Sequence, residues 1–193
     1  MLYAAYRLKR MNKKKLATEI AKLLGLLILG GSLFVSVPCQ AADPLPATHV
    51  YFSPKGGCTK AITDAIGQAK QSILVQAYSF TSYPIAEALI DVQKRGAKVE
   101  AIFDKGQLHE KKTKLGLLVK GGVSTYLDGA HAIAHNKVMI IDGKTVITGS
   151  FNFTNAAEEH NAENLLILDD AALAAEYTSN WQMHKKHSEH YKI

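Results

Sequence analysis

Short β-branched runs alternate with amphipathic helical patterns along the first half of the chain after residue 47. Runs typical of strands occupy 48–53, 72–79, 98–103 and 123–127. Patterns typical of helices lie between them, over 59–70, over 84–95 and, with basic character, around 109–120. This β-α-β-α-β-α-β order predicts a sheet of parallel strands that is covered by helices on both faces.

The pattern changes in the second half of the chain. Two apolar runs, 137–142 and 145–149, flank Gly143-Lys144 and predict a β-hairpin. A further strand is expected over 164–168, after which Asp169 or Asp170 can cap a last helix that runs to about residue 187. The whole pattern predicts an α/β fold, namely an α/β/α sandwich with a mixed, largely parallel central sheet.

The first 41 residues have the composition of a secretory signal. The basic segment 12–15 precedes an uncharged, mostly apolar stretch over 23–37, and Cys39-Gln40-Ala41 fits a small-x-small cleavage site. We therefore expect a signal peptide over 1–41 and a periplasmic or secreted protein. Met11 itself opens an ordinary signal sequence, so residues 1–10 can be a misassigned start. An uncleaved membrane anchor is the alternative, although 15 apolar residues fall short of the roughly 18 that a spanning helix needs.

Composition limits the class of protein for the remaining chain. With 47% hydrophobic and 21% charged residues, a disordered tail, a coiled coil and a polytopic membrane protein are excluded. The net charge of +6 comes from residues 1–41, which hold seven basic residues and one acid, whereas the rest holds sixteen of each. The positive net charge of the whole chain therefore gives no indication of its binding partners. Residues 42–47 are a Pro-rich linker, and 48–193 are expected to form one domain.

Cleavage of the signal would leave Cys58 as the single cysteine, which excludes a disulfide framework within the chain. In an oxidising compartment such a thiol is buried, free or paired with another molecule. Because Cys58 directly precedes the amphipathic segment 59–70, we expect it to be buried.

The segment 135–152 carries the candidate chemistry. His135 and Lys137 share one face of a strand because side chains alternate with period two, and Ser150 and Asn152 repeat this alternation further along the chain. A lysine can neutralise an anionic electrophile while an imidazole acts as nucleophile or proton carrier. Four such groups around one point would form a phosphate or oxyanion site.

This spacing resembles the signature of the phospholipase D superfamily, His-x-Lys-(x)4-Asp-(x)6-Gly-Ser-x-x-Asn. The first half is matched by His135, Lys137 and Asp142. Gly149-Ser150 follows after the required six residues, and Asn152 takes the place used by the small members. The segments LVQAYSF and GSFNFT resemble the short, single-motif bacterial endonucleases of that superfamily. The resemblance extends over 48–193, which would then be a phospholipase D-like catalytic domain.

The resemblance implies a two-step phosphodiester hydrolysis that needs neither metal nor cofactor. A motif histidine attacks phosphorus to give a phosphohistidine, and a second histidine protonates the leaving oxygen and then activates water. His135 would be the nucleophile or the acid/base, and Glu163, where the family carries an acid, would fix the imidazole tautomer. The phosphate oxygens would be held by Lys137, Ser150 and Asn152. Asp142 ends an apolar strand before a tight turn, so its role is either catalytic or structural.

One motif supplies one histidine, but the implied reaction needs two. The nearest second candidate, His109-x-Lys111, has Gly116 where the signature requires Asp. A two-fold dimer brings the same surface patch of two subunits together and would complete the site. We therefore expect a homodimer with its active site at the interface.

The other histidines, the basic run and the aromatic residues each have a simpler interpretation. His184, His187 and His190 recur at intervals of three and are expected to form a solvated helix end, and the pair His131 and His135 is not expected on a helix, so no metal site is predicted. A basic run either lies on an exposed helix face or follows a nucleic-acid backbone; it comprises Lys105, Lys111, Lys112, Lys114 and Lys120. Four aromatic residues are expected mostly in the core, namely Tyr78, Phe80, Phe151 and Phe153.

The sequence is consistent with three functions. The first is a nuclease of low sequence specificity that acts on DNA, with RNA as a second substrate. The second is a phospholipase D that acts on phosphatidylcholine-type lipids, since a fold and a motif do not settle the substrate. The third is a non-catalytic protein that binds nucleic acid or phosphate.

Overall fold

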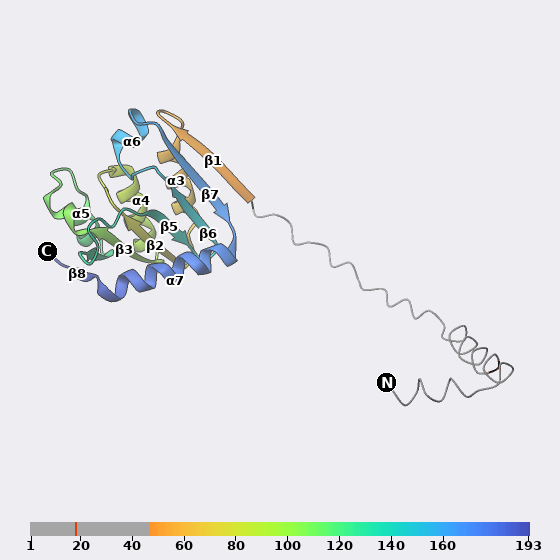
Figure 1. Ribbon diagram of the computed structural model, residues 1–193. Helices are drawn as coiled ribbons and strands as arrows, with labels where there is room; N and C mark the ends of the chain where they lie inside the picture. The colour runs from red at the N-terminus through yellow and green to blue at the C-terminus, as the bar shows by residue number, and fades with distance from the viewer. Residues whose placement is uncertain (1–17, 19–46) are drawn as a thin grey trace. The chain divides into compact units, whose positions relative to one another are not determined.

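Eight strands in the described part of the chain form one sheet, in the order β1-β7-β6-β5-β2-β3-β4-β8 (Figure 1). The computed structural model describes Thr18 and residues 47–193, so the predicted signal peptide lies outside the described residues. The strands are β1 (Ala47–Ser53), β2 (Ser72–Ala77), β3 (Lys98–Asp104), β4 (Ser124–Asp128), β5 (Lys137–Ile141), β6 (Thr145–Gly149), β7 (Glu163–Asp169) and β8 (Glu189–Tyr191). Strand β1 thus takes up the last residue of the predicted linker.

The α/β class and the mixed sheet are confirmed, but the expectation of a largely parallel sheet is wrong. Only β2–β3 and β3–β4 pair in parallel, and the other five neighbouring pairs of the described sheet are antiparallel. The β5–β6 connection shows one physical reason. It has three residues, whereas a parallel neighbour needs a crossover of a dozen or more. The alternation of the first half therefore does not represent the whole sheet.

Helices cover both faces of the sheet, as the sandwich predicts. On one face lie α3 (Cys58–Gln68), α4 (Tyr83–Lys94) and α5 (Leu115–Lys120), over a core that includes Ile62, Leu89 and Phe103. The long helix α7 (Ala171–His187) crosses the other face, where it buries Ala174 and Trp181 against Ile102, Val138, Ile140 and Val146 (Figure 1). The short helix α6 (Asn155–Glu159) lies between β6 and β7 in the chain.

Helix α7 is fixed at both its start and its middle. The Asp170 carboxylate accepts a hydrogen bond of 2.9 Å from the backbone N–H of Leu173, so this residue is the predicted helix cap. Further along, the buried Trp181 donates its indole N–H to the carbonyl oxygen of Val75 on β2, at 2.8 Å. These contacts define where the last turns of the helix lie.

Two local expectations have different outcomes. The buried position of Cys58 is confirmed, with burial and the nearby Glu158 charge raising the pKa of its thiol to about 11. The prediction of a basic helix around 109–120 is wrong for the first part of this segment. Asp104 accepts from the N–H of Gly106 and begins a 3-10 helix, η1 (Lys105–His109), so the α-helix begins only at Leu115. Within the described residues, no helix has the length and apolar character needed to cross a membrane.

Candidate active site

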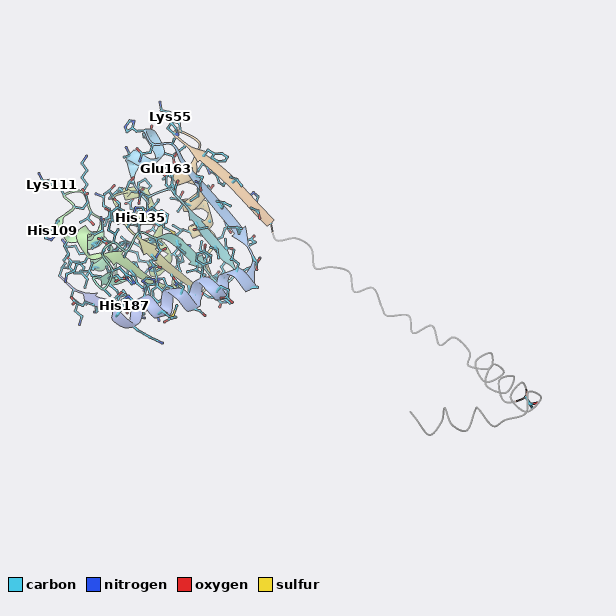
Figure 2. The ribbon with its side chains drawn as sticks, viewed as in Figure 1. Lys55, His109, Lys111, His135, Glu163 and His187 are labelled. Carbon is cyan, nitrogen blue, oxygen red and sulfur yellow. The ribbon has the colours of Figure 1, made fainter. Side chains whose placement is uncertain are left out.

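Five of the residues singled out by the motif line a single cavity of about 410 Å³. These five residues lie at or beside neighbouring ends of the strands β5, β6 and β7. Tyr177 of α7 also lines the cavity. The predicted residues in the cavity wall are His135, Lys137, Ser150, Asn152 and Glu163. The antiparallel arrangement brings them together, because the first residues of β5, the last residues of β6 and the first residues of β7 lie at the same edge of the sheet. His135 and Glu163 are labelled in Figure 2.

The imidazole of His135 and the ammonium of Lys137 are in direct contact. Lys137 Nζ lies 3.0 Å from His135 Nδ1 and donates to the carbonyl oxygen of His135 at 2.7 Å. The ring of Tyr78 packs on the imidazole, with centroids 4.6 Å apart, and lies 5.1 Å from the lysine ammonium. The histidine is itself exposed, so solvent or substrate can reach it.

Lys137 is the buried cation of this cavity. Its exposed fraction is 7%, and burial lowers the pKa of its ammonium, a shift that the negative charge of Glu163 opposes. A buried ammonium has lost most of its hydration and gains strongly from an anion that takes the place of water. The geometry therefore favours a bound phosphate oxygen beside Lys137.

Glu163 holds Ser150 and not the imidazole. Its Oε2 accepts a hydrogen bond of 2.6 Å from Ser150 Oγ, and its Oε1 accepts one of 3.2 Å from Asn161. The serine oxygen in turn accepts from the backbone N–H of Asn164 at 3.1 Å. No hydrogen bond joins Glu163 to His135 in the described structure, so the expected tautomer-fixing contact is absent from it. The carboxylate orients the serine hydroxyl instead.

Gly149 and Asn152 show why this strand end needs its particular residues. Gly149 has φ +147°, and a Cβ there would come within 2.3 Å of the carbonyl oxygen of Asn164, which any other residue would have to displace. The side-chain oxygen of Asn152 is buried and has no hydrogen-bond partner. An amide oxygen only accepts hydrogen bonds, so a phosphate oxygen in the cavity would be bound by the NH2 group of Asn152 and not by this oxygen.

Asp142 lies away from this cavity, at the far end of β5. Its carboxylate accepts hydrogen bonds of 2.8, 2.8 and 2.9 Å from the backbone N–H groups of Lys70, Gln71 and Ser72. Burial raises the pKa of Asp142, but these three donors outweigh it and hold the pKa below its ordinary value. The structure thus corrects the catalytic assignment and supports the structural one: Asp142 fixes the turn before β2.

The second His-x-Lys pair and most of the aromatic residues lie outside the cavity. Figure 2 shows His109 and Lys111 on the segment beside α5, apart from His135. Phe80, Phe151 and Phe153 are fully buried, as expected of core residues. Tyr78 is the exception, since it packs on the catalytic candidate His135.

The histidines near the C-terminus correct another expectation. His184 and His187 do not form a solvated stripe, because both face the buried carboxylate of Asp128, as does His131. His190 stands apart from them and packs on Tyr126. Asp128 and His184 are 56 residues apart in the sequence, so no local pattern could have signalled that they meet.

Sequence comparisons agree with the geometry of the cavity. Residues 62–185 match the protein family described as "Cardiolipin synthase, PLD-like domain". A "Phospholipase D" of Rickettsia bellii is 39% identical over 197 residues, which cover 92% of this chain and 98% of that protein. The chain belongs to the phospholipase D superfamily.

Solved structures of this superfamily share the fold. Nuc from Salmonella typhimurium, described as a phospholipase D family member, superimposes with a TM-score of 0.73 at 34% identity, over 77% of this chain and 99% of Nuc. NucT from Helicobacter pylori gives a TM-score of 0.70 at 27% identity, over 76% of this chain and 99% of NucT. Because the family is shown and the chain carries the His-x-Lys-(x)4-Asp-(x)6-Gly-Ser part of the signature, it is a phosphodiesterase of the phospholipase D superfamily.

Proposed function

We propose that this phosphodiesterase is a nuclease of low sequence specificity that cuts DNA, with RNA as a second substrate. The observation that carries the proposal is the single cavity in which His135, Lys137, Ser150 and Asn152 meet. Its donors suit a phosphate group, which recurs along every nucleic acid, and base-specific readout would require further contacts. The likeness to Nuc and NucT, which extends over 99% of each of those chains, supports the nucleic-acid substrate.

The chemistry proposed for the cavity needs two imidazoles in opposite protonation states. Nε2 of one His135 attacks phosphorus, the P–O bond to the leaving group breaks, and His135 of the partner subunit gives its proton to the departing oxygen. Water then attacks the phosphohistidine while the partner's His135 takes a proton from that water, which restores both rings. Lys137 would balance the charge that develops on the phosphate oxygens.

We propose a homodimer because each chain supplies one such imidazole. The outer part of the sheet supports this. Val50 and Phe52 on the edge strand β1 are 50% and 65% exposed, and Phe52 pairs in register with Asn164, which contacts Ser150. An apolar surface so close to the cavity is suited to an isologous contact with a second copy.

A phospholipase D activity is the second candidate. The name of the Rickettsia bellii relative and the description of the matched family both refer to lipid enzymes. Both activities would use the same phosphate-binding groups, so the cavity alone does not separate them. A protein that only binds phosphate is the third candidate, and the intact His135–Lys137 pair argues against it.

The decisive experiment compares substrates side by side. Plasmid DNA, RNA and phosphatidylcholine vesicles are incubated with the protein and with its His135→Asn variant, and His109→Asn serves as the matched histidine control. We expect nicked plasmid from the wild type and the control, and none from His135→Asn. Choline release without any nicking would contradict the nuclease proposal and favour the phospholipase D activity. Inactivity on all three substrates would favour a protein that only binds phosphate.

A second measurement tests the intermediate. Rapid acid-free quenching of a reaction with phosphorus-labelled DNA should leave acid-labile label on the wild-type chain and none on His135→Asn. Turnover without any labelled chain would contradict nucleophilic catalysis by this histidine. The proposed periplasmic or secreted location rests on residues 1–41 alone, and a processed N-terminus after Ala41 in cell fractions would support it.

A further inference from the structure

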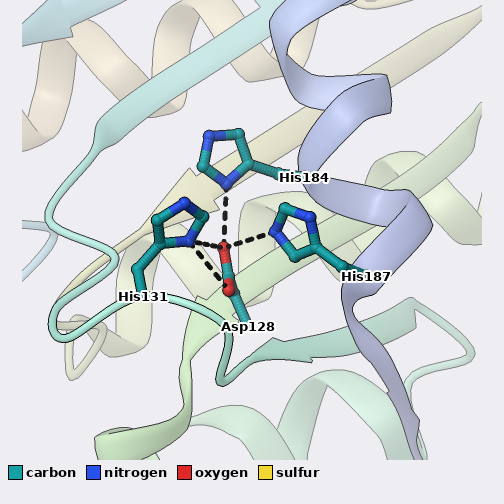
Figure 3. Close-up of side chains that lie close together, drawn as sticks. All are labelled: Asp128, His131, His184 and His187. Atoms are coloured by element: carbon teal, nitrogen blue, oxygen red, sulfur yellow. Dashed lines mark hydrogen bonds and ion pairs between the residues drawn. The ribbon is translucent and has the colours of Figure 1, made fainter.

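Three imidazoles surround one buried carboxylate on the α7 face of the sheet (Figure 3), and none of these four residues lines the cavity described above. Asp128 Oδ2 lies 3.1 Å from His131 Nδ1, 2.8 Å from His184 Nδ1 and 3.3 Å from His187 Nε2. The Asp128 side chain is fully buried. The three rings form a nearly equilateral triangle, with centroids 4.9, 5.2 and 5.3 Å apart.

The elements that supply these groups are fixed independently of the cluster. Asp128 is the last residue of β4, and His131 follows it in the loop to β5. His184 and His187 lie one turn apart near the end of α7, whose position Trp181 fixes through its bond to Val75. The sheet and the helix therefore bring Asp128, His184 and His187 together without a contribution from the cluster itself.

The donor set has the chemistry of a transition-metal site. Three imidazoles and one carboxylate suit Zn²⁺ and the similar divalent ions of the first transition row, whereas Mg²⁺ and Ca²⁺ prefer sites built from oxygen. One ligand atom from each residue lies within 4.8 Å of all the others. Tetrahedral zinc with bonds of about 2.0–2.1 Å requires ligand atoms about 3.3 Å apart. The side chains of His131 and His187 are 45% and 37% exposed and are free to make the required small rotations.

From this geometry we propose that Asp128, His131, His184 and His187 form a zinc site that cross-links the end of α7 to the loop between β4 and β5. Four protein ligands complete a tetrahedral shell and leave no open position, which is the pattern of a structural and not a catalytic zinc. The bound metal would hold the loop between β4 and β5 in place, and this loop leads directly into His135 and Lys137. The proposal does not depend on the substrate of the enzyme.

The test measures metal on the purified full-length protein. After chelator treatment and its removal, the protein is titrated with Zn²⁺ and separately with Co²⁺, followed by elemental analysis, visible absorption and thermal unfolding. We expect one metal ion per chain, the absorption of tetrahedral Co²⁺ with nitrogen and oxygen ligands, and a melting temperature that rises with Zn²⁺. A wild-type protein without stoichiometric metal would show a cluster joined by hydrogen bonds alone and would overturn the proposal.

Variants locate the metal. His131→Gln is chosen because its side chain is the most exposed of the three imidazoles, and His184→Gln removes a ligand from the helix. Each should weaken Zn²⁺ binding by about 100-fold or more, beyond what the loss of an outer-shell partner costs. His190→Gln is the matched control, since it removes the third histidine of the same spacing without touching the cluster. Zinc affinity equal to the wild type in His131→Gln, or lost in His190→Gln, would contradict the assignment.

Catalytic activity provides a separate readout. The initial rate of phosphodiester hydrolysis, measured below the melting temperature and per folded molecule, should change less than threefold in His131→Gln, because its side chain lies outside the cavity. Loss of metal together with retained chemistry identifies a structural zinc. If metal removal abolished hydrolysis by fully folded protein, the proposed structural role would be wrong.

Discussion

The ammonium of Lys137 lies 3.0 Å from Nδ1 of His135 and 2.7 Å from the carbonyl oxygen of the same residue. An ammonium has donors only, so Nδ1 accepts and a neutral imidazole carries its proton on Nε2. In this tautomer Nε2 has no free lone pair and cannot attack phosphorus, and a neutral ring is too weak an acid to protonate the leaving oxygen. A phosphate that attracts Lys137 away from the ring would release Nδ1, which permits the Nδ1–H tautomer, the nucleophile, in one subunit of the proposed dimer and the imidazolium, the acid, in the other.

Replacing Lys137 by methionine should separate activity from stability. The substitution keeps a side chain of similar volume but removes a cation from the phosphate site, so we expect kcat to fall by about 10²–10³-fold. Because the ammonium is buried, its loss should leave the free energy of unfolding unchanged or raise it by about 1 kcal/mol. Hydrolysis rates and urea unfolding of the two proteins check this. A large loss of stability would show that Lys137 is mainly structural.

The pH dependence of the same pair of proteins provides a control. Burial lowers the pKa of Lys137 below its ordinary value of 10.5, so the unfolded chain binds more protons between the folded pKa and 10.5. The cost of burying the charge is therefore full at neutral pH and disappears as the pH rises through that window. Wild-type stability should gain in this range relative to Lys137→Met.

The Glu163→Gln variant tests whether the Glu163 carboxylate orients Ser150 or His135. If Glu163 orients Ser150, as the 2.6 Å contact indicates, the amide still accepts from the hydroxyl, and we expect kcat to fall by about 10-fold. A carboxylate that fixes the tautomer of a catalytic imidazole is worth about 10⁴-fold when it is changed to an amide. A loss of about 10⁴-fold in kcat would indicate that Glu163 fixes the tautomer of His135, as the family resemblance implies. Glu159→Gln, on α6 outside the cavity, is the matched control.

The pH–rate profile of Glu163→Gln supplies a further readout. The charge of Glu163 opposes the fall in the pKa of Lys137 that burial causes. Without that charge the ammonium loses its proton at lower pH, so the alkaline limb of the profile should move to lower pH. An unmoved limb would show that the charged form of Lys137 does not limit the rate.

Asp142→Asn should reduce stability and leave the chemistry intact. Asn tolerates the positive φ of 53° at this position, but it has one neutral oxygen where the carboxylate has two. That oxygen can replace Oδ1, which accepts from Gln71 and Ser72, while the NH2 group would face the N–H of Lys70 that Oδ2 accepts. We expect the free energy of unfolding to fall by about 1–2 kcal/mol, with kcat within threefold of the wild type. Asp91→Asn, at an exposed ion pair of 4.0 Å, should change stability by under about 0.5 kcal/mol.

The sign of the pH effect follows from the lowered pKa of Asp142. Its contribution to stability is complete above its ordinary value of 3.8 and is lost as the pH falls through the folded pKa. The stability difference between the wild type and Asp142→Asn should therefore be full at neutral pH and shrink in acid. A difference that persisted below the folded pKa would show that the carboxylate charge is not its cause.

The sequence predicts this site better than it predicts the sheet around it. That His135, Lys137, Ser150 and Asn152 lie around one cavity could be predicted because the motif fixes both residue type and spacing over 18 positions. Strand direction is set by contacts between distant segments, such as β1 with β7, and no local pattern contains them. The hydrophobic alternation is the same for a parallel and an antiparallel neighbour.

The errors at single side chains have the same physical origin. Glu163 and Ser150 are 13 residues apart, and their contact depends on how β6 and β7 align. His184 and His187 meet Asp128 only because α7 crosses the sheet to the end of β4, whereas His131 lies three residues after Asp128 in the chain. By contrast, the structural role of Asp142 could be anticipated from its place before a tight turn, which is a local feature.

Mixing active and inactive subunits should reveal whether two chains share one site. Wild type and His135→Asn are unfolded together and refolded at equal amounts, with a size tag on one chain so that heterodimers can be separated. If each site needs both copies of His135, heterodimers are inactive and the total activity falls to about a quarter of that of wild type at the same total concentration. Independent sites would retain about half, and an isolated heterodimer with half activity would contradict the shared site. Co-refolding with His109→Asn, which leaves the cavity intact, should preserve full activity. The size of the loss thus separates an active site built from two imidazoles from one that works within a single chain.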